Sequence, residues 1–163
     1  MAQVEALAIG IPSGNTWHGI KSKSEIRSLE KKLAALKAFL NAGELLTNSE
    51  WETFSNIWEP VNVKRKEIIT RSEQTEKYIY FVLEGIQRIY YTSESDNEAT
   101  LVLIYAHSFG GVMDSFLLQT PSRYSYESLT PSSLLRAPYN KFIEATSKSS
   151  NLDGIIKRFT YGA

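Results

Sequence analysis

The chain has 163 residues, of which 42% are apolar, and this content is enough to bury one core but hardly two. Basic and acidic residues balance at 18 each, so no overall field draws the protein onto nucleic acid or an acidic membrane surface. The sequence contains no cysteine, which excludes a disulfide framework and a thiolate metal site and fits a reducing cytoplasm.

The sequence also lacks the signals of secretion and membrane insertion. Its first residues are apolar only in a short run and have no basic leading region, so they form a poor signal peptide. Nowhere does an uncharged apolar run reach the roughly 20 residues that a membrane span requires. We therefore expect a soluble, cytoplasmic protein with no membrane partner.

Two segments precede the expected main domain. Residues 1–22 contain Pro12, glycines and small residues without a sustained period, and we expect an irregular N-terminal arm. Residues 23–46 are expected to hold the N-terminal helix, because their apolar residues recur at spacings of three and four. This apolar stripe consists of Ile26, Leu29, Leu33, Leu36 and Leu40. We expect it to pack against the main domain; the alternative is a self-association seam that makes the protein a homodimer or an interaction module.

A second helix opens the main domain, which is expected to span residues 47–146. Thr47 and Glu50 have the spacing of a capping box, in which the two residues satisfy amide donors at a helix start. Pro60 is expected to end this helix, because proline has no amide hydrogen with which to continue the ladder. Three aromatic residues share one face of the helix: Trp51, Phe54 and Trp58.

From Val61 the pattern becomes that of a β-strand, apart from a basic run at residues 64–66. Three charges beside a strand are typical of an exposed surface, although a phosphate-binding patch is the alternative. Lys64, Arg65 and Lys66 are therefore expected to lie in solvent.

The central part of the domain is rich in strand formers. Residues 78–83 and 86–92 flank Glu84 and Gly85, and a two-residue turn that ends in glycine is typical of a β-hairpin. We therefore expect these two strands to pair. After a polar turn, residues 100–105 are apolar on nearly both faces, which predicts a central strand.

A glycine corner and a short helix follow. Ser108, Phe109 and Gly110 form the corner, and residues 112–118 are expected to be the helix. Strands are then expected at residues 124–129 and 134–137, and a helix near residues 139–145. Residues 147–163 form the C-terminal helix, because their apolar residues return to a helical spacing.

The order of these elements resembles the cyclic-nucleotide-binding domain of the Crp/Fnr family of bacterial regulators over residues 45–145. Three motifs carry the resemblance: Phe81–Gly85 followed by Arg88, the Ser108–Phe109–Gly110 corner, and Pro121 with the strand after it. The resemblance implies a mainly β fold with flanking helices, a double-stranded β-helix or jelly roll. It also implies that the corner, the short helix and the following loop form a phosphate-binding cassette, whose occupancy the helices relay to an output module.

An anion in such a cassette would be held by backbone amides at the helix start and by a cation that completes its neutralisation. The resemblance implies a small-molecule effector as the ligand. The expected ligand-binding residues are Gly110, Gly111, Val112, Met113, Asp114, Ser115, Ser122, Arg123 and Tyr124.

Three positions depart from the family pattern. Gly111 stands where the family has a glutamate that holds the ribose 2′-hydroxyl. In the family an arginine directly follows the proline and pairs with the phosphate, whereas here Ser122 does so and Arg123 comes one residue later, facing the opposite way in an extended segment. Asp114, in the first turn of the helix, either repels a phosphate or serves as a favourable N-terminal charge. We therefore expect weak or no binding of cAMP and cGMP, with a different nucleotide or another small anionic effector as the alternative.

The resemblance predicts an effector-binding sensory domain of a transcription regulator that takes part in signal transduction. A helix-turn-helix reader is not expected within this chain, because residues 147–163 leave no room for a recognition helix and no basic cluster replaces it. We therefore expect no direct binding of DNA by this chain.

A cupin-like enzyme is the competing class. Cupin metal sites need two or three histidines and a carboxylate, whereas this sequence has only His18, in the expected arm, and His107 near the corner. The sequence contains no serine nucleophile elbow and no Walker loop. We expect no catalytic residues, no metal and no cofactor other than the effector.

Overall fold

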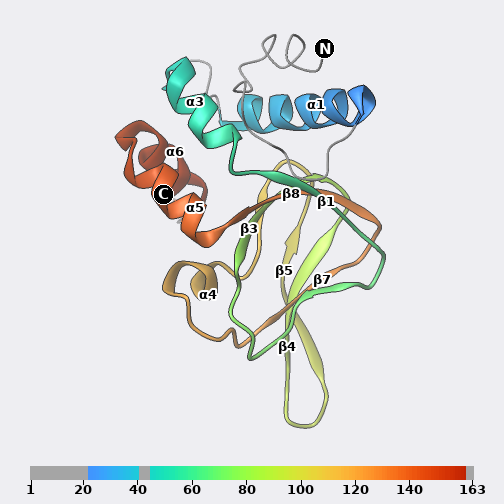
Figure 1. Cartoon of the computed structure of the whole chain (residues 1–163). Coiled ribbons are helices and arrows are strands. Elements are labelled where there is room, and N and C mark those ends of the chain that lie inside the picture. Colours follow the sequence, from blue (N-terminus) through green and yellow to red (C-terminus); the bar gives the residue numbers. More distant parts are fainter. Residues whose placement is uncertain (1–21, 41–44, 161–163) are drawn as a thin grey trace. The chain divides into compact units, whose positions relative to one another are not determined.

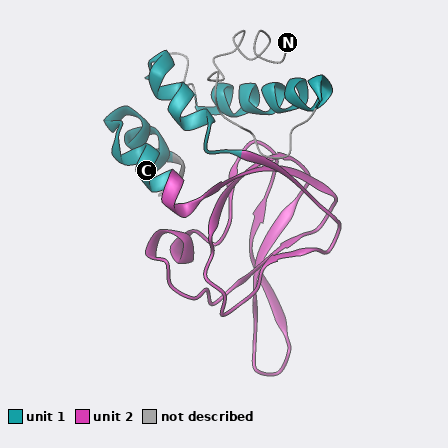
Figure 2. Ribbon diagram, in the orientation of Figure 1, with its two compact units in different colours: residues 1–58, 142–163 teal, residues 59–141 magenta. Residues whose placement is uncertain are grey.

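The computed structural model describes residues 22–40 and 45–160 and divides the chain into two compact units (Figure 2). One unit comprises Met1–Trp58 and Phe142–Ala163, and the other comprises Glu59–Lys141. The expected arm lies outside the described residues except for Ser22, and so does His18. The domain limits expected at residues 47 and 146 stay a prediction.

The first unit begins with α1, Lys23–Leu40, which confirms the helix predicted from the apolar stripe. Ile26 is half-buried, whereas the four leucines of the stripe are buried. Residues 41–44, in the last part of the predicted segment, lie outside the described residues.

The capping box predicted at Thr47 and Glu50 is present at the start of α3, Asn48–Ser55. The Glu50 amide donates to Thr47 Oγ1 at 3.1 Å, and the Thr47 amide donates to Glu50 Oε1 at 3.0 Å. The second oxygen of the Glu50 carboxylate accepts from the Ser149 hydroxyl, and Ser149 Oγ accepts from the Leu152 amide at 3.1 Å. Glu50 thereby links the start of α3 to the start of α6, Ser150–Thr160.

The predicted end of the second helix is wrong. The helix ends at Ser55, and Pro60 lies within β1, Glu59–Val63. Because β1 is at the edge of its sheet, a residue without an amide hydrogen is tolerated there. Trp58 is nevertheless buried, and its ring packs against Phe54 and against Phe142 of α5, Tyr139–Ser147.

The second unit is built from two four-stranded antiparallel sheets (Figure 1). One sheet has the order β1-β8-β3-β6 and the other the order β2-β7-β4-β5, which together confirm the predicted jelly roll. A short helix, α4, Met113–Leu118, follows β6. The remaining strands are β2 (Ile68–Thr70), β3 (Tyr78–Glu84), β4 (Gln87–Thr92), β5 (Glu98–Ile104), β6 (Phe109–Gly110), β7 (Ser125–Ser128) and β8 (Ser132–Pro138).

A cluster of buried side chains from both sheets forms the core of the second unit. Tyr80 and Tyr126 are its largest members, and their ring centroids lie 5.5 Å apart at an interplanar angle of 56°. Both tyrosines are buried, so two aromatic rings pack against each other inside the barrel. The other buried members are Val63, Val82, Ile104, Val112 and Leu134.

The predicted pairing of the strands around Gly85 is wrong. β3 pairs with β6 and β8, whereas β4 pairs with β5 and β7, so Gly85 lies where the chain crosses from one sheet to the other. Gly85 has φ +98°, and a Cβ atom there would lie 2.1 Å from Ser132 Oγ. The glycine is therefore required by the local conformation and by the close approach of the turn before β8. The turn signal is real, but long-range pairing decides which strands become neighbours.

The predicted central position of the strand at residues 100–105 is also wrong. β5 is at the edge of its sheet, and Ile104 is its one buried residue. Figure 1 shows that β4 and β5 continue as a long hairpin beyond the other strands. Val102 and Leu103 lie outside this extension, opposite β4 residues that pair with β7, and they are exposed at the edge of the sheet, where β5 has no second neighbouring strand. Leu101, Leu103 and Tyr105 are 51%, 46% and 54% exposed.

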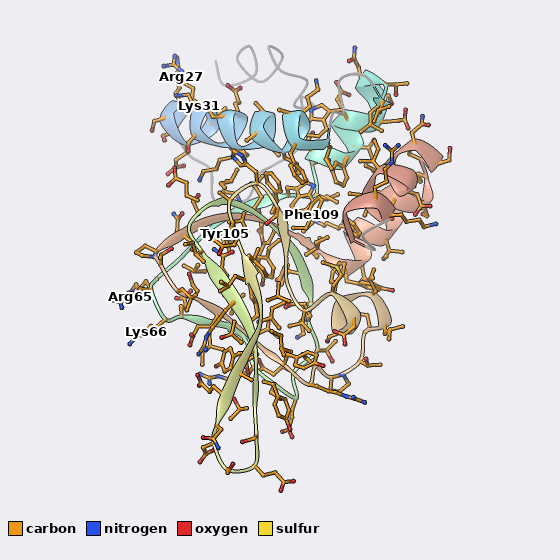
Figure 3. The ribbon with its side chains drawn as sticks, turned by 180° about the vertical axis from the view of Figure 1, so that it is seen from behind. Arg27, Lys31, Arg65, Lys66, Tyr105 and Phe109 are labelled. Atoms are coloured by element: carbon orange, nitrogen blue, oxygen red, sulfur yellow. The ribbon has the colours of Figure 1, made fainter. Side chains whose placement is uncertain are left out.

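The basic run between β1 and β2 is exposed, as predicted, and Figure 3 shows Arg65 and Lys66 pointing outward from the turn. Among the described residues, no helix combines the length and the apolar character needed to cross a membrane.

Candidate functional site

The predicted glycine corner is present. β6 ends at Gly110, Gly111 has φ +109°, and Val112 is the residue before the first turn of α4. A Cβ atom at Gly110 would lie 2.5 Å from Tyr126 Oη, and one at Gly111 would lie 3.2 Å from the Tyr78 carbonyl oxygen. Gly110 is therefore needed because a larger residue would clash with Tyr126. Gly111 is needed because of its close neighbours and also because of its positive φ.

The amide that follows the corner already has an acidic partner from the same chain. Val112 N donates to Glu76 Oε2 at 3.2 Å, and Thr70 Oγ1 donates to the same oxygen at 2.9 Å. The Glu76 amide in turn donates to Ser115 Oγ at 2.9 Å. The carboxylate of Glu76, which is 1% exposed, therefore occupies the position at the start of α4 where an anionic ligand would accept hydrogen bonds.

Burial dominates the electrostatics of this carboxyl. Burial raises the pKa of Glu76 above its ordinary value, and the hydrogen bonds from Val112 and Thr70 reverse only part of the increase. Burial and the neighbouring Glu76 also raise the pKa of the Tyr80 hydroxyl. The interior next to the corner is thus already acidic and poorly solvated, which disfavours a second negative charge.

The end of α4 closes over the same residue. Gln119 adopts a left-handed conformation, with φ 53°, and its Nε2 donates to the carbonyl oxygens of Glu76 at 3.0 Å and Phe116 at 2.7 Å. Ser115 Oγ donates to the Thr120 carbonyl. These contacts fix the short helix to the segment that carries Glu76.

The predicted site residues fall into buried, half-buried and exposed groups. Met113 and Tyr124 are half-buried, whereas Asp114 and Arg123 are exposed. Asp114 Oδ1 accepts from the Ser115 amide at 2.8 Å, as expected for a charge in the first turn of a helix. The buried members are Gly110, Gly111, Val112, Ser115 and Ser122.

The loop after α4 does not bring Arg123 to the corner. Ser122 is the buried residue of the pair, and its Oγ both donates to the Tyr124 carbonyl at 2.8 Å and accepts from the Tyr124 amide at 2.9 Å. Arg123 points into solvent, and its carbonyl oxygen accepts from Ser72 Oγ at 3.3 Å. The opposite orientation of neighbouring residues in an extended segment accounts for this arrangement.

A cavity of about 410 Å³ lies beside Glu76. Arg136 of β8 is one of the charged residues in its wall, with Glu76 and Lys77. Arg136 Nε donates to Glu59 Oε1 at 2.6 Å, and its guanidinium lies 4.2 Å from the centre of the Tyr78 ring. The lining residues are Ile69, Thr70, Gln74, Thr75, Glu76, Lys77, Tyr78, Tyr80 and Arg136.

The described residues contain no group of three or more histidine or acidic side chains arranged to hold a metal ion. His107 follows β5 with φ 61°; its amide donates to the Val82 carbonyl at 2.6 Å, and its ring stacks on Phe81.

In the second unit, a strand of the jelly roll turns through two glycines into a short helix. Residues 60–149 match the family model described as the cyclic nucleotide-binding domain. The match covers more than half of the chain, and the chain belongs to the cyclic nucleotide-binding domain family.

Solved structures confirm the fold. The sensor domain of the transcriptional regulator DNR from Pseudomonas aeruginosa is 15% identical with a TM-score of 0.67, over 80% of this chain and 86% of that one. The catabolite activator protein of Thermus thermophilus is 18% identical with a TM-score of 0.61, over 72% of this chain and 54% of that one. The regulatory subunit of a cAMP-independent protein kinase A from Trypanosoma brucei is 18% identical with a TM-score of 0.64, over 88% of this chain and 51% of that one. No curated protein sequence matches the chain.

Sequence reasoning missed Glu76 and Arg136. An acidic residue just before an apolar strand is usual at a surface, so nothing local distinguishes Glu76. Arg136 does carry a signal, because it stands two residues after Leu134 in an apolar strand and must share a face with that core residue.

Proposed function

We propose that this chain is the effector-binding sensory domain of a Crp/Fnr-type transcription regulator whose cassette recognises cAMP and cGMP weakly or not at all. The observation that carries the proposal is the hydrogen bond from the Val112 amide to the Glu76 carboxylate. The chain supplies its own anion at the position where the family resemblance places the phosphate.

Two further observations support weak recognition. A cyclic phosphate next to Val112 would lie close to the carboxylate of Glu76, and like charges about 4 Å apart repel by roughly 1–4 kcal/mol in partly solvated surroundings. The cation that would offset this repulsion is not at hand, because Arg123 is exposed. We therefore infer that the domain has the architecture of a sensor but responds to an effector other than cAMP or cGMP.

The proposed mechanism is binding and conformational relay rather than catalysis. An effector would shift the populations of conformers in the barrel, and the flanking helices would pass the change to a DNA reader. The balanced charge of the chain does not favour direct contact between this chain and DNA. Self-association through the stripe of α1 is not favoured, because its four leucines are buried in the single chain.

Isothermal titration calorimetry with cAMP and cGMP tests the proposal. The unaltered protein should give no saturable heat in the micromolar range, and Glu76→Gln should bind about tenfold more tightly because it removes a like charge. Glu67→Gln is the matched control, since Glu67 is exposed in the turn between β1 and β2. A low-micromolar Kd for cAMP in the unaltered protein would overturn the proposal.

A further inference from the structure

The cavity beside Glu76 has an arginine in its wall. Arg136 lies between Glu59 of β1 and Tyr80 of β3 in the strand register, so its side chain is on the face of the sheet that carries the tyrosine core. Its side chain is 32% exposed. A guanidinium on the inner face of a barrel, still reachable from solvent, is a preformed receptor for an oxyanion.

The guanidinium keeps hydrogen-bonding capacity beyond its ion pair. The bond from Arg136 Nε to Glu59 uses one of the five N–H donors of the group. The Arg136 side chain also approaches the Tyr80 hydroxyl, where it favours the charged form of the tyrosine. A ligand carboxylate at the outer edge of the fork can therefore bind while Glu59 keeps its contact.

Aromatic side chains form the wall next to this charge. The rings of Tyr78 and Tyr80 lie 6.2 Å apart, tilted by 52°, and Arg136 stacks on Tyr78. Ile69 of β2 adds an apolar side chain to the lining. A planar ring inserted here gains apolar contacts and aromatic packing, and a volume of about 410 Å³ suits a compact ligand, near the lower end of the usual range of about 300–1,000 Å³.

The charges around the cavity limit the charge of its ligand. Arg136 and the rim residue Lys77 are basic, whereas Glu59 and Glu76 are acidic. Because these four side chains balance, a ligand with one negative group finds a cation, while a second negative group would meet a carboxylate.

We propose that this cavity is the effector site of the domain and that it takes a small planar ring carrying a single carboxylate, held by Arg136 and packed on Tyr78 and Tyr80. This inference rests on the proposed sensory function and deepens it. None of the residues from 109 to 118 lines the cavity, although Glu76, Tyr78 and Tyr80 in its wall are next to Gly111. Arg136, rather than Arg123, supplies the cation.

Two-dimensional ¹H–¹⁵N NMR of the full chain, titrated with benzoate, tests the inference. Benzoate should shift the amides of residues 69–80 and 136 in a saturable way. Benzyl alcohol, which has the ring without the charge, and inorganic phosphate, which has the charge without the ring, should each bind at least about tenfold more weakly.

Variants assign the effect to one arginine. Arg136→Gln should weaken benzoate binding about tenfold or more, whereas the matched control Arg123→Gln should change it less than about twofold. Arg136→Lys, which keeps the charge but loses the planar fork, should fall between them. The spectra themselves report whether each variant is folded.

Three results would overturn the inference: no saturable shift with benzoate, equal binding of benzyl alcohol, or equal losses in Arg136→Gln and Arg123→Gln. A cAMP titration of the same sample separates this inference from the proposed function. Saturable cAMP shifts centred on residues 110–115 would refute the proposed loss of cAMP recognition and leave the benzoate result to decide the cavity on its own.

Discussion

Two carboxylates at helix starts behave in opposite ways in the two units of the chain. Glu50 caps α3 in the helical unit, and the hydrogen bond from Ser149, followed by that from the Thr47 amide, lowers its pKa. Glu76 accepts from the first amide of α4 in the barrel, yet burial raises its pKa. Both side chains accept comparable hydrogen bonds, so the difference comes from the loss of water around Glu76.

The comparison teaches that the same residue type can be a stabilising cap or an obstruction to ligands, depending on burial. In the helical unit the capping carboxylate is solvated and keeps a favourable negative charge. In the barrel the buried carboxylate satisfies the amide that a ligand would need. If the proposed function holds, a capping contact that would be unremarkable at a surface limits the anions that the barrel can bind.

The largest expected effect comes from removing the buried carboxylate. Glu76→Ala leaves the Val112 amide and the Thr70 hydroxyl without their acceptor in a buried position, and it should lower the free energy of unfolding by roughly 2–4 kcal/mol. Urea unfolding followed by circular dichroism measures the loss. Glu67→Ala, at an exposed position, should stay within about 0.5 kcal/mol, and equal losses in the two variants would contradict the role given to Glu76.

The two carboxyls should also give pH dependences of opposite sign. The folded-state pKa of Glu76 is above its ordinary value of 4.5, so its contribution to stability is full below pH 4.5 and is lost as the pH rises through the folded pKa. The folded-state pKa of Glu50 is below 4.5, so its contribution is present above pH 4.5 and is lost as the pH falls through the folded pKa.

The free energy of unfolding of Glu76→Gln and Glu50→Gln, measured beside the unaltered protein between about pH 3 and 8, resolves these slopes. The advantage of the unaltered protein over Glu76→Gln should shrink with rising pH, and its advantage over Glu50→Gln should grow. Slopes of the same sign would remove the contrast between the two units.

The smallest effect is expected at a third carboxylate, Asp114, which also lies in the first turn of α4 but is exposed. Asp114→Asn keeps an oxygen that can accept from the Ser115 amide, so it should change the free energy of unfolding by less than about 0.5 kcal/mol. Urea unfolding at pH 7 checks this value. A loss as large as that of Glu76→Ala would mean that proximity to α4, rather than burial, sets the energetics.

The parts of the fold with local signals could be predicted from the sequence. The apolar stripe of α1, the capping box at Thr47 and the glycine corner at Gly110 each depend on residues a few positions apart. The jelly roll itself came from resemblance to a family, because the periodicity of short strands does not by itself specify how sheets are ordered.

The errors arose where long-range contacts override local patterns. Gly85 has the conformation that a turn needs, but the choice between a hairpin and a crossing between sheets depends on pairing with β8 and β7. The apolar faces of β5 are typical of a central strand, but β5 pairs with β4 alone and lies at the edge of its sheet, an order that its own residues do not specify.

For the candidate site, the sequence was sufficient to locate the glycine corner but not to identify Glu76, the residue that contacts it. The glycines and the shifted Arg123 could be interpreted because the resemblance supplies a pattern for them. Glu76 could not, because its contact with Val112 joins residues 36 positions apart and no spacing rule connects them.

The register of the β4–β5 hairpin has a consequence for how the molecule behaves at high concentration. Leu101 has no partner in the strand register, because Ile89 is opposite Val102 and Tyr90 is opposite Thr100. An extra residue of this kind bends the strand and interrupts the regular row of amides and carbonyls along its outer side. Although the hairpin exposes apolar side chains, we expect this irregularity to make its edge a poorer template for the pairing of further chains.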